Sequence, residues 1–345
     1  MLATVVLGVP AAAAAVEPAG KAQDPEPRHF VFFGLERDRI REPVFLETAA
    51  IAGAQLKYTW RELEPERDRY ALDSLREDAA FLESHGKQLF VQIQDVSFEE
   101  AIVNVPDYLL EDPVFEGGVA VKYEFDGDDE STAVSDGWVA RQWDPAVRDR
   151  FVELLRMLGR EFDGRIEGVN LAETAVDFGG SGRLHPSGFT HEGYTEAVKD
   201  IMTAAKEAFP RSHVIQYANF MPGEWLPWTD RGYLRSVYEH ADRIGCGVGG
   251  PDLLPHRKGQ KQHSYPLIAA RGSGTAAGVA VQWGNLDAKN PETGARVTVE
   301  ELVRFARHEL RLDFLFWGTQ EPYYSDEILP YLGTGHSRDR GHADP

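Results

Sequence analysis

The feature that most constrains the fold is a regular alternation of short apolar segments with amphipathic ones. Glycine, proline or polar turns bound each apolar segment, as expected for buried strands. We predict strands over residues 29–36, 55–60, 87–95, 165–174, 213–219, 246–250, 276–284 and 312–317. We predict helices over residues 42–54, 71–85, 146–162, 190–209, 232–243, 298–310 and 325–331. Eight strands alternating with helices indicate an α/β protein, a closed (β/α)8 or TIM barrel. An open doubly wound sheet is disfavoured because no Gly-x-Gly-x-x-Gly turn follows the first strand.

The length of 345 residues fits one barrel with insertions. We therefore expect a single catalytic barrel domain over residues 29–333, with a long insertion after strand three, residues 96–145, and a flexible tail over 334–345. Residues 1–20 contain the run Ala11 to Ala15 and small residues suited to a signal cleavage site, although a basic start is missing. This pattern predicts a leader and a secreted or periplasmic protein. Residues 21–28 are rich in Pro and charge and are predicted to be a linker.

The charge of the chain restricts its partners. A formal net charge of −20 repels phosphate backbones and anionic lipid, so we expect neither nucleic acid nor membrane as a partner. A neutral ligand fits better. Cys246 is the only cysteine, so no intrachain disulfide can form. The histidines form no His-x-x-x-His pair, and we expect no metal and no cofactor.

Polar and aromatic residues gather at the predicted carboxyl ends of the strands, where barrel enzymes carry their active sites. Acids, amides and rings without clustered Lys or Arg suit a polyhydroxylated ligand, whose hydroxyls need partners and whose apolar faces stack on rings. We therefore expect a carbohydrate, with Trp60, Trp283 and Trp317 as sugar platforms. The full set of candidate substrate-binding residues is Glu36, Tyr58, Trp60, Gln94, Asp95, Asn170, Asp177, Asn219, Asp252, Gln282, Trp283, Asn285 and Trp317.

Residues 58–70 read Tyr-Thr-Trp-Arg-Glu-Leu-Glu-Pro-Glu-Arg-Asp-Arg-Tyr. This run resembles the W-x-x-L-E-P-x-x-G-x-Y run common in clan A, the barrel glycoside hydrolases that include β-galactosidases, β-mannanases and cellulases; Asp68 stands where Gly is usual. The third strand and the fourth-strand Asn-Glu region also follow in the order expected there. The resemblance implies a glycoside hydrolase in which Glu173, at the end of strand four, is the general acid/base.

Two departures limit what the resemblance implies. Asn170 precedes Glu173 by three positions instead of one, and Gln282 stands where a nucleophilic Glu is expected at the end of strand seven. An amide cannot form a glycosyl ester. Gln282 could be an introduced substrate-trapping change, the protein could be a non-catalytic relative, or another strand could supply the second carboxylate.

We favour the third explanation, with Glu321 as the second catalytic residue and with Glu36, Asp95, Asp177 and Asp252 as further candidates. Strands four and eight face each other across a barrel. Their carboxyl groups would therefore be separated more widely than a retaining pair at about 5–5.5 Å, and about 6.5–9.5 Å would predict inversion.

The leading hypothesis is a glycoside hydrolase that cleaves an oligo- or polysaccharide with two carboxylates. The alternative is a carbohydrate-binding barrel without catalysis, which Gln282 favours. A lyase on uronic-acid polymers is a third hypothesis, and the net charge and the few basic rim residues disfavour it.

Overall fold

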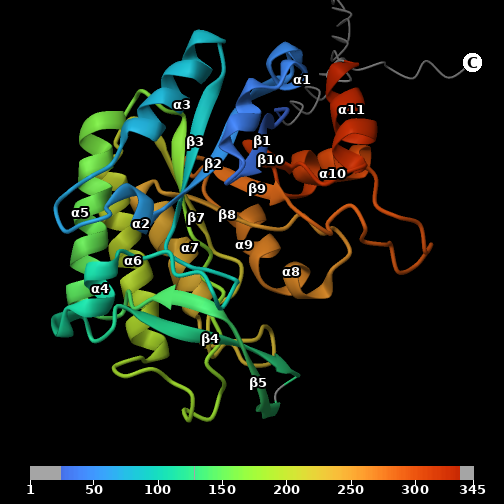
Figure 1. Ribbon diagram of the computed structural model, residues 1–345. Coiled ribbons are helices and arrows are strands. Elements are labelled where there is room, and N and C mark those ends of the chain that lie inside the picture. The colour runs from blue at the N-terminus through green and yellow to red at the C-terminus, as the bar shows by residue number, and fades with distance from the viewer. Residues whose placement is uncertain (1–24, 128, 335–345) are drawn as a thin grey trace, which may run out of the picture.

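The computed structural model describes residues 25–127 and 129–334, and these form a closed barrel of eight parallel strands (Figure 1). The strands are β1 (Arg28–Gly34), β2 (Ile51–Thr59), β3 (Gln88–Gln94), β6 (Gly168–Leu171), β7 (His213–Tyr217), β8 (Gly247–Gly250), β9 (Ala277–Val281) and β10 (Phe314–Gly318). Around the barrel they follow the order β1, β10, β9, β8, β7, β6, β3, β2. The predicted (β/α)8 fold is confirmed, and each strand predicted from the sequence is present. The predicted leader, residues 1–20, lies outside the described residues.

The predicted helix over residues 42–54 is wrong in its second half. Helix α1 covers only Pro43–Glu47, and residues 51–54 already belong to β2. This part of β2 lies between two strands, with His29 of β1 opposite Ile51 and Gln88 of β3 opposite Gly53. The approach is so close that a Cβ at Gly53 would lie 1.9 Å from the Gln88 carbonyl oxygen. Pairing on both sides therefore overrides the local preference of these residues for helix.

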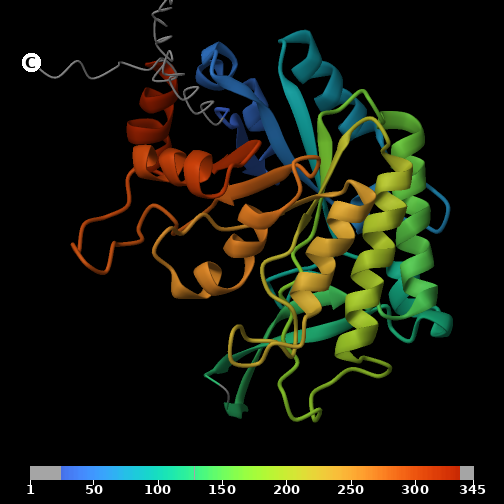
Figure 2. The same ribbon diagram turned by 180° about the vertical axis from the view of Figure 1, so that it is seen from behind.

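Helices cover the outside of the barrel (Figures 1 and 2). They include α3 (Asp73–Ser84), α5 (Pro145–Phe162), α6 (His191–Ala208), α7 (Tyr233–Ile244), α9 (Ser264–Ala270), α10 (Val299–Arg304) and α11 (Leu329–Gly333). The predicted N-caps of α6 and α10 are confirmed, because Thr190 Oγ1 accepts from Gly193 N at 2.9 Å and Thr298 Oγ1 from Glu301 N at 3.2 Å. Within the described ranges, no helix has the length and apolarity that a bilayer crossing requires.

Alternation along each strand sorts side chains into two cores. Inside the barrel, Phe30, Phe90 and Phe316 pack edge to face, with ring centroids 5.0 Å apart for Phe30–Phe90 and for Phe90–Phe316. Their neighbours Val31 and Leu315 point the other way and pack beneath the helices. The aromatic plug fills the interior nearer the amino ends of the strands and leaves the carboxyl ends of the strands as the place for a ligand.

The segment between β3 and α5 forms an additional hairpin. It contains α4 (Asp107–Glu111) and the antiparallel strands β4 (Val119–Asp126) and β5 (Asp129–Ala140). Figures 1 and 2 show the hairpin beyond the barrel, at the lower edge of the view. Backbone hydrogen bonds fix its position: Ser97 N donates to Trp138 O at 2.7 Å, and Tyr123 N donates to Asp177 O at 3.1 Å. The insertion is therefore attached at the carboxyl ends of β3 and β6.

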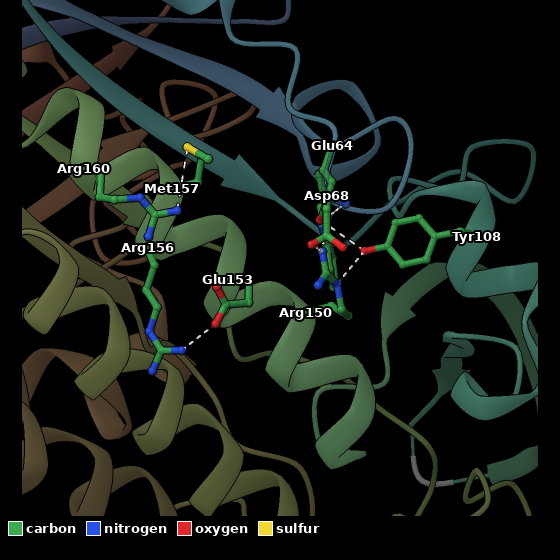
Figure 3. A network of polar contacts seen from close by, with 9 residues as sticks. Glu64, Asp68, Tyr108, Arg150, Glu153, Arg156, Met157 and Arg160 are labelled. Atoms are coloured by element: carbon green, nitrogen blue, oxygen red, sulfur yellow. Dashed lines mark hydrogen bonds and ion pairs between the residues drawn. The ribbon is translucent and has the colours of Figure 1, made fainter.

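A buried ion network joins the loop after β2 to α5 (Figure 3). Glu64 is fully buried, and its carboxylate accepts from Arg150, from Trp60 Nε1 at 3.0 Å and from Tyr108 Oη at 3.1 Å. Arg150 also pairs with Asp68 at 2.9 Å. Glu64 belongs to the run over residues 58–70 that resembles clan A. Its contacts show that this part of the run is structural, since it holds the second strand against a helix.

Arg150→Met should lower the free energy of unfolding by about 3–5 kcal/mol, because it leaves the buried Glu64 carboxylate without its counter-ion. Arg156, further along α5, pairs with Glu153 in solvent. The matched change Arg156→Met should therefore cost less than about 1 kcal/mol. Urea unfolding of both variants measures the difference, and similar losses for the two would contradict the structural role of Glu64.

Candidate active site

A cavity of about 180 Å³ opens into the barrel at the carboxyl ends of its strands. Its walls combine amides, one ammonium and one carboxyl group, and rings contribute to its lining. The residues that line it are Phe32, Gln55, Lys57, Gln92, Gln94, Phe98, Glu173, Tyr217, Pro251, Ala280 and Gln282. A pocket of mixed apolar and hydrogen-bonding character suits a small polar molecule or one unit of a longer one.

Glu173 is the carboxyl group of this cavity. It follows the end of β6, and the next residue is anchored because Thr174 N donates to Tyr217 O at 3.0 Å and Thr174 Oγ1 to Phe220 O at 2.6 Å. The Glu173 carboxylate accepts from Asn219 Nδ2 at 2.6 Å. Two neighbouring strands thus hold this side chain at the mouth of the barrel, as predicted from the sequence.

The surroundings of Glu173 favour its protonated form. Burial raises the pKa of Glu173, and the nearby charge of Asp252 raises it further. The hydrogen bond from Asn219 and the charges of Lys122 and Lys57 act in the opposite direction without cancelling the effect. A raised pKa favours the role of a carboxyl group as a proton donor to a bound ligand.

Asp252 is the second acid near the cavity. It lies in the loop after β8, where its Oδ1 accepts from Asn285 Nδ2 at 2.9 Å and from Gln282 Nε2 at 3.4 Å. Tyr265 Oη donates to its backbone oxygen at 3.0 Å. Asn285 in turn accepts from Gln282 N at 3.2 Å, so the ends of β8 and β9 are tied together. Gln282 therefore supports a carboxylate with its amide.

Asp95 lies behind Glu173 in a smaller cavity of about 40 Å³ between the barrel and its helices. Its Oδ2 accepts from Gln142 Nε2 at 2.8 Å, and burial raises the pKa of Asp95 to about 6. Tyr194 and Gln216 line the same space. Asp95 supports the region under Glu173 and does not line the main cavity.

A wider outer cavity of about 420 Å³ adjoins Asp252 and is lined also by Trp283 and Asn285. Trp283 is 70% exposed, so its ring is available as a platform for a sugar face. Of the predicted residues, Gln94, Glu173 and Gln282 line the main cavity. Asn219 and Asp252 lie beside it through their contacts with Glu173 and Gln282.

Asn170 lies beneath these residues, in the interior of the barrel. It is fully buried, and neither its side-chain oxygen nor its nitrogen has a hydrogen-bond partner among the described residues. Its position on β6 matches that of Gly168, where a Cβ would meet the Phe90 ring at 2.5 Å. Both residues therefore face the inside of the barrel.

Three predicted aromatic contacts are wrong because the side chains point away from the cavity. Tyr58 donates its hydroxyl to Asp78 Oδ2 of α3 at 2.7 Å. Trp60 and Trp317 are both fully buried between the barrel wall and outer elements, with Trp317 Nε1 donating to His29 Nδ1 at 3.1 Å. Alternation explains two of the three, because Lys57 and Phe316 face the barrel interior and the residues that follow them, Tyr58 and Trp317, therefore face outward. Trp60 begins a short helix after β2 and packs on Phe151 of α5.

Three predicted acids also lie away from the cavity. Glu321, expected to be the second catalytic carboxylate, is exposed and accepts from Ser325 Oγ at 2.7 Å and Ser325 N at 3.2 Å. Glu36 is exposed and pairs with Arg39 at 3.0 Å. Asp177 is exposed, and its Oδ1 accepts from Gly179 N at 2.8 Å. None of the three lines the cavity that contains Glu173.

Sequence reasoning missed the wall formed by Gln55, Lys57 and Gln92. Their spacing was a usable signal, because Gln55 and Lys57 alternate with Leu56 and Tyr58 along one strand. Lys122 was also missed, because only the folded hairpin brings it close enough to influence the pKa of Glu173. Within the described ranges, no group of three or more His, Cys, Asp or Glu side chains is arranged to hold a metal ion.

No protein-family model matches the chain, and no curated protein matches its sequence. Solved structures are similar in fold. The catalytic domain of β-amylase from Paenibacillus polymyxa matches with a TM-score of 0.55 and 9% identity, over 87% of this chain and 93% of that chain. A GH10 endoxylanase from a sugarcane soil metagenome matches with a TM-score of 0.50 and 13% identity, over 87% and 89% of the two chains.

A GH5_18 protein from Streptomyces cattleya, solved in complex with GlcNAc, has a TM-score of 0.50 and 13% identity, over 86% of this chain and 71% of that chain. These structures are (β/α)8-barrel glycoside hydrolases, so the predicted resemblance is confirmed at the level of the fold.

Asp95→Asn should change the dependence of stability on pH. The folded pKa of about 6 lies above the usual value of 3.8, so Asp95 contributes fully below about pH 4, and this contribution is lost as the pH rises through 6. Relative to the variant, the wild type should lose up to about 3 kcal/mol of unfolding free energy between pH 4 and 7. Urea unfolding at both pH values measures this, and a difference independent of pH would contradict the buried, protonated Asp95.

Proposed function

We propose that the protein is a glycoside hydrolase in which Glu173 donates a proton to the leaving oxygen of a glycosidic bond. The observation that carries this proposal is the environment of Glu173: a cavity-lining carboxyl group held by Asn219 at 2.6 Å, with a raised pKa. A general acid must retain its proton at the working pH, and burial beside a second acid shifts the pKa of Glu173 in that direction. The fold shared with glycoside hydrolases supports the same reaction class.

Asp252 is the second carboxylate in this proposal, in place of Glu321. It is the acid whose charge raises the pKa of Glu173, and the amides of Asn285 and Gln282 orient it. In the first step, the Glu173 proton moves to the leaving oxygen as the bond to the anomeric carbon breaks. As this bond breaks, Asp252 either takes a proton from the water that attacks the anomeric carbon or attacks that carbon itself to form a glycosyl ester. In the second case a water, which gives its proton to the now ionised Glu173, hydrolyses the ester and frees Asp252.

The substrate is an oligo- or polysaccharide. The amides of Gln55, Gln92 and Gln94 offer hydrogen-bonding groups to hydroxyls inside the cavity, and Trp283 offers an exposed ring outside it. Gln282, which lines the inner cavity, donates to Asp252, which lines the outer one, and we propose that one glycan occupies both cavities. Export from the cell, expected from residues 1–20, is part of this proposal, because polymeric glycans are met outside the cytoplasm.

Glu173→Gln keeps the shape of the side chain and an acceptor for Asn219 but removes the acidic proton. It should lower the rate of release of reducing ends from a panel of polysaccharides by about 10²–10⁴-fold. Glu207→Gln, on the exposed surface of α6, is the matched control and should retain full activity. Full activity in Glu173→Gln would eliminate Glu173 as the acid.

The wild-type rate should also fall as the pH rises through the raised pKa of Glu173, and this alkaline fall should be absent from the residual activity of Glu173→Gln. Proton NMR of the first product anomer distinguishes the two roles of Asp252, because inversion requires a base and retention a nucleophile.

A carbohydrate-binding barrel without catalysis is the second candidate, and the amide of Gln282 favours it. Gln282→Glu separates the two functions. If Asp252 is the working carboxylate, the change replaces a hydrogen-bond donor with a repelling charge and should lower activity at least about 10-fold. If the cavity lacks only a nucleophile, Gln282→Glu should instead create activity that the wild type does not have.

A further inference from the structure

The cavity has two chemically different sides. In the barrel order, β2 and β3 lie across from β8 and β9. Gln55 and Lys57 of β2 and Gln92 of β3 therefore form a wall opposite Gln282 and the loop that carries Asp252. One wall has amides and an ammonium group, and the other has the carboxylate proposed to act on the anomeric carbon. A ligand bound between the two walls must suit the amides and the ammonium group on one side and the carboxylate on the other.

The β2–β3 wall leaves polar atoms without partners. Gln55 Nε2 donates to Tyr217 Oη at 3.0 Å, but Gln55 Oε1 is buried and has no donor within the described chain. Gln92 Oε1 is buried and unpartnered in the same way. Buried amide oxygens without donors are costly, so both positions call for donors from a ligand or from water. Sugar hydroxyls supply such donors.

Lys57 needs an acceptor, whereas the two glutamine oxygens need donors. Its ammonium group has neither an ion pair nor a hydrogen-bond acceptor among residues 25–127 and 129–334, and the nearest group described for it is the Phe32 ring, with its centroid 5.3 Å from Nζ. Burial lowers the pKa of Lys57 against the opposing effect of Glu173. The other lysine near the cavity, Lys122, is already paired with Asp136. Lys57 thus shares a confined cavity with Glu173, whose charge acts on it, but forms no ion pair within the described ranges.

The Glu173 carboxylate accepts from Asn219 and forms no ion pair with Lys57. Asp252 is held on the opposite side of the barrel by Asn285 and Gln282. A neutral sugar would satisfy Gln55 and Gln92 but would leave the Lys57 ammonium without a compensating charge. A carboxylate would supply both the acceptor and the charge, and charge-assisted hydrogen bonds are about twice as strong as neutral ones.

We propose that the sugar unit bound in this cavity is a uronic acid whose carboxylate pairs with Lys57 and whose hydroxyls donate to Gln55 and Gln92. The inference rests on the proposed glycoside hydrolase function and names its substrate class. It replaces the expectation of a neutral ligand, which depended on the shortage of basic residues at the rim. Lys57 lies below the rim, on the strand itself. Repulsion from Asp252 directs the sugar carboxylate to the β2–β3 wall and turns the glycosidic bond towards Glu173.

Binding to matched acid and neutral sugars tests the inference. Isothermal titration calorimetry of the full chain carrying Glu173→Gln, which binds without turnover, would compare the methyl glycosides of glucuronate and glucose, galacturonate and galactose, and mannuronate and mannose. At least one acid should bind about 10-fold more tightly than its neutral partner, which corresponds to about 1.4 kcal/mol. Adding Lys57→Gln should reduce that preference to less than about 2-fold, whereas Lys57→Arg should retain it.

Lys199→Gln, on α6 and paired with Glu196, is the control and should leave the preference unchanged. Thermal unfolding of each variant checks that it is folded, and retention of the preference by Lys57→Arg separates the charge of Lys57 from a purely structural role. Equal binding of acid and neutral partners in all three pairs would overturn the inference, and so would an acid preference that survives Lys57→Gln.

Turnover by the wild type separates this inference from the proposed function. Cleavage of nitrophenyl glycosides of neutral sugars, with no faster cleavage of the matching uronides, would retain the hydrolase and overturn the acid specificity. A Lys57-dependent acid preference without hydrolysis of any uronide would retain the recognition of the acid and overturn the hydrolase. Unsaturated uronide products would likewise retain the recognition of the acid and overturn the hydrolase, because the reaction would then be elimination and not hydrolysis.

Discussion

Closure of the barrel is the constraint on which the rest of the structure depends. Because eight parallel strands pair in a ring, alternate side chains of every strand must point either into a narrow interior or out under the helices. Rings fill the lower interior, where Phe30, Phe90 and Phe316 meet edge to face. Above them, the inward positions carry polar groups. The same alternation thus produces both a solid floor and a polar cavity.

The charged side chains of that cavity influence one another because the cavity lies inside the barrel. In water, the charges of Glu173, Lys57 and Asp252 would interact weakly, but inside the barrel each one changes the proton affinity of its neighbours. Burial and Asp252 raise the pKa of Glu173, while Lys57 and Lys122 limit the rise. Lys122 contributes because the hairpin of β4 and β5 is attached at the carboxyl ends of β3 and β6. The insertion therefore tunes the acid as well as shaping the mouth of the site.

The sequence predicted the architecture well because strand-forming segments are local. Apolar runs bounded by turns located all eight strands, and the positions of Glu173, Asn219, Asp252 and Gln282 around one rim followed from the strand order. It was harder to predict which side chains of a strand point into the barrel. Both faces of a barrel strand are buried, so apolar pattern alone does not tell which face is inside. Tyr58, Trp60 and Trp317 were assigned to the cavity for this reason, although the polar alternation of Gln55 and Lys57 contained the correct orientation.

Glu321 is a loop residue whose position could not be predicted from the sequence. Glu321 follows its strand by a few residues, but it binds Ser325 within its own loop and not the barrel mouth. The most direct test of the account is a crystal structure of Glu173→Gln with a bound oligosaccharide. The account predicts a glycosidic oxygen within about 2.6–3.2 Å of the residue 173 side chain, with Asp252 facing the anomeric carbon. An oligosaccharide bound only outside the barrel, with no sugar between these two residues, would contradict it.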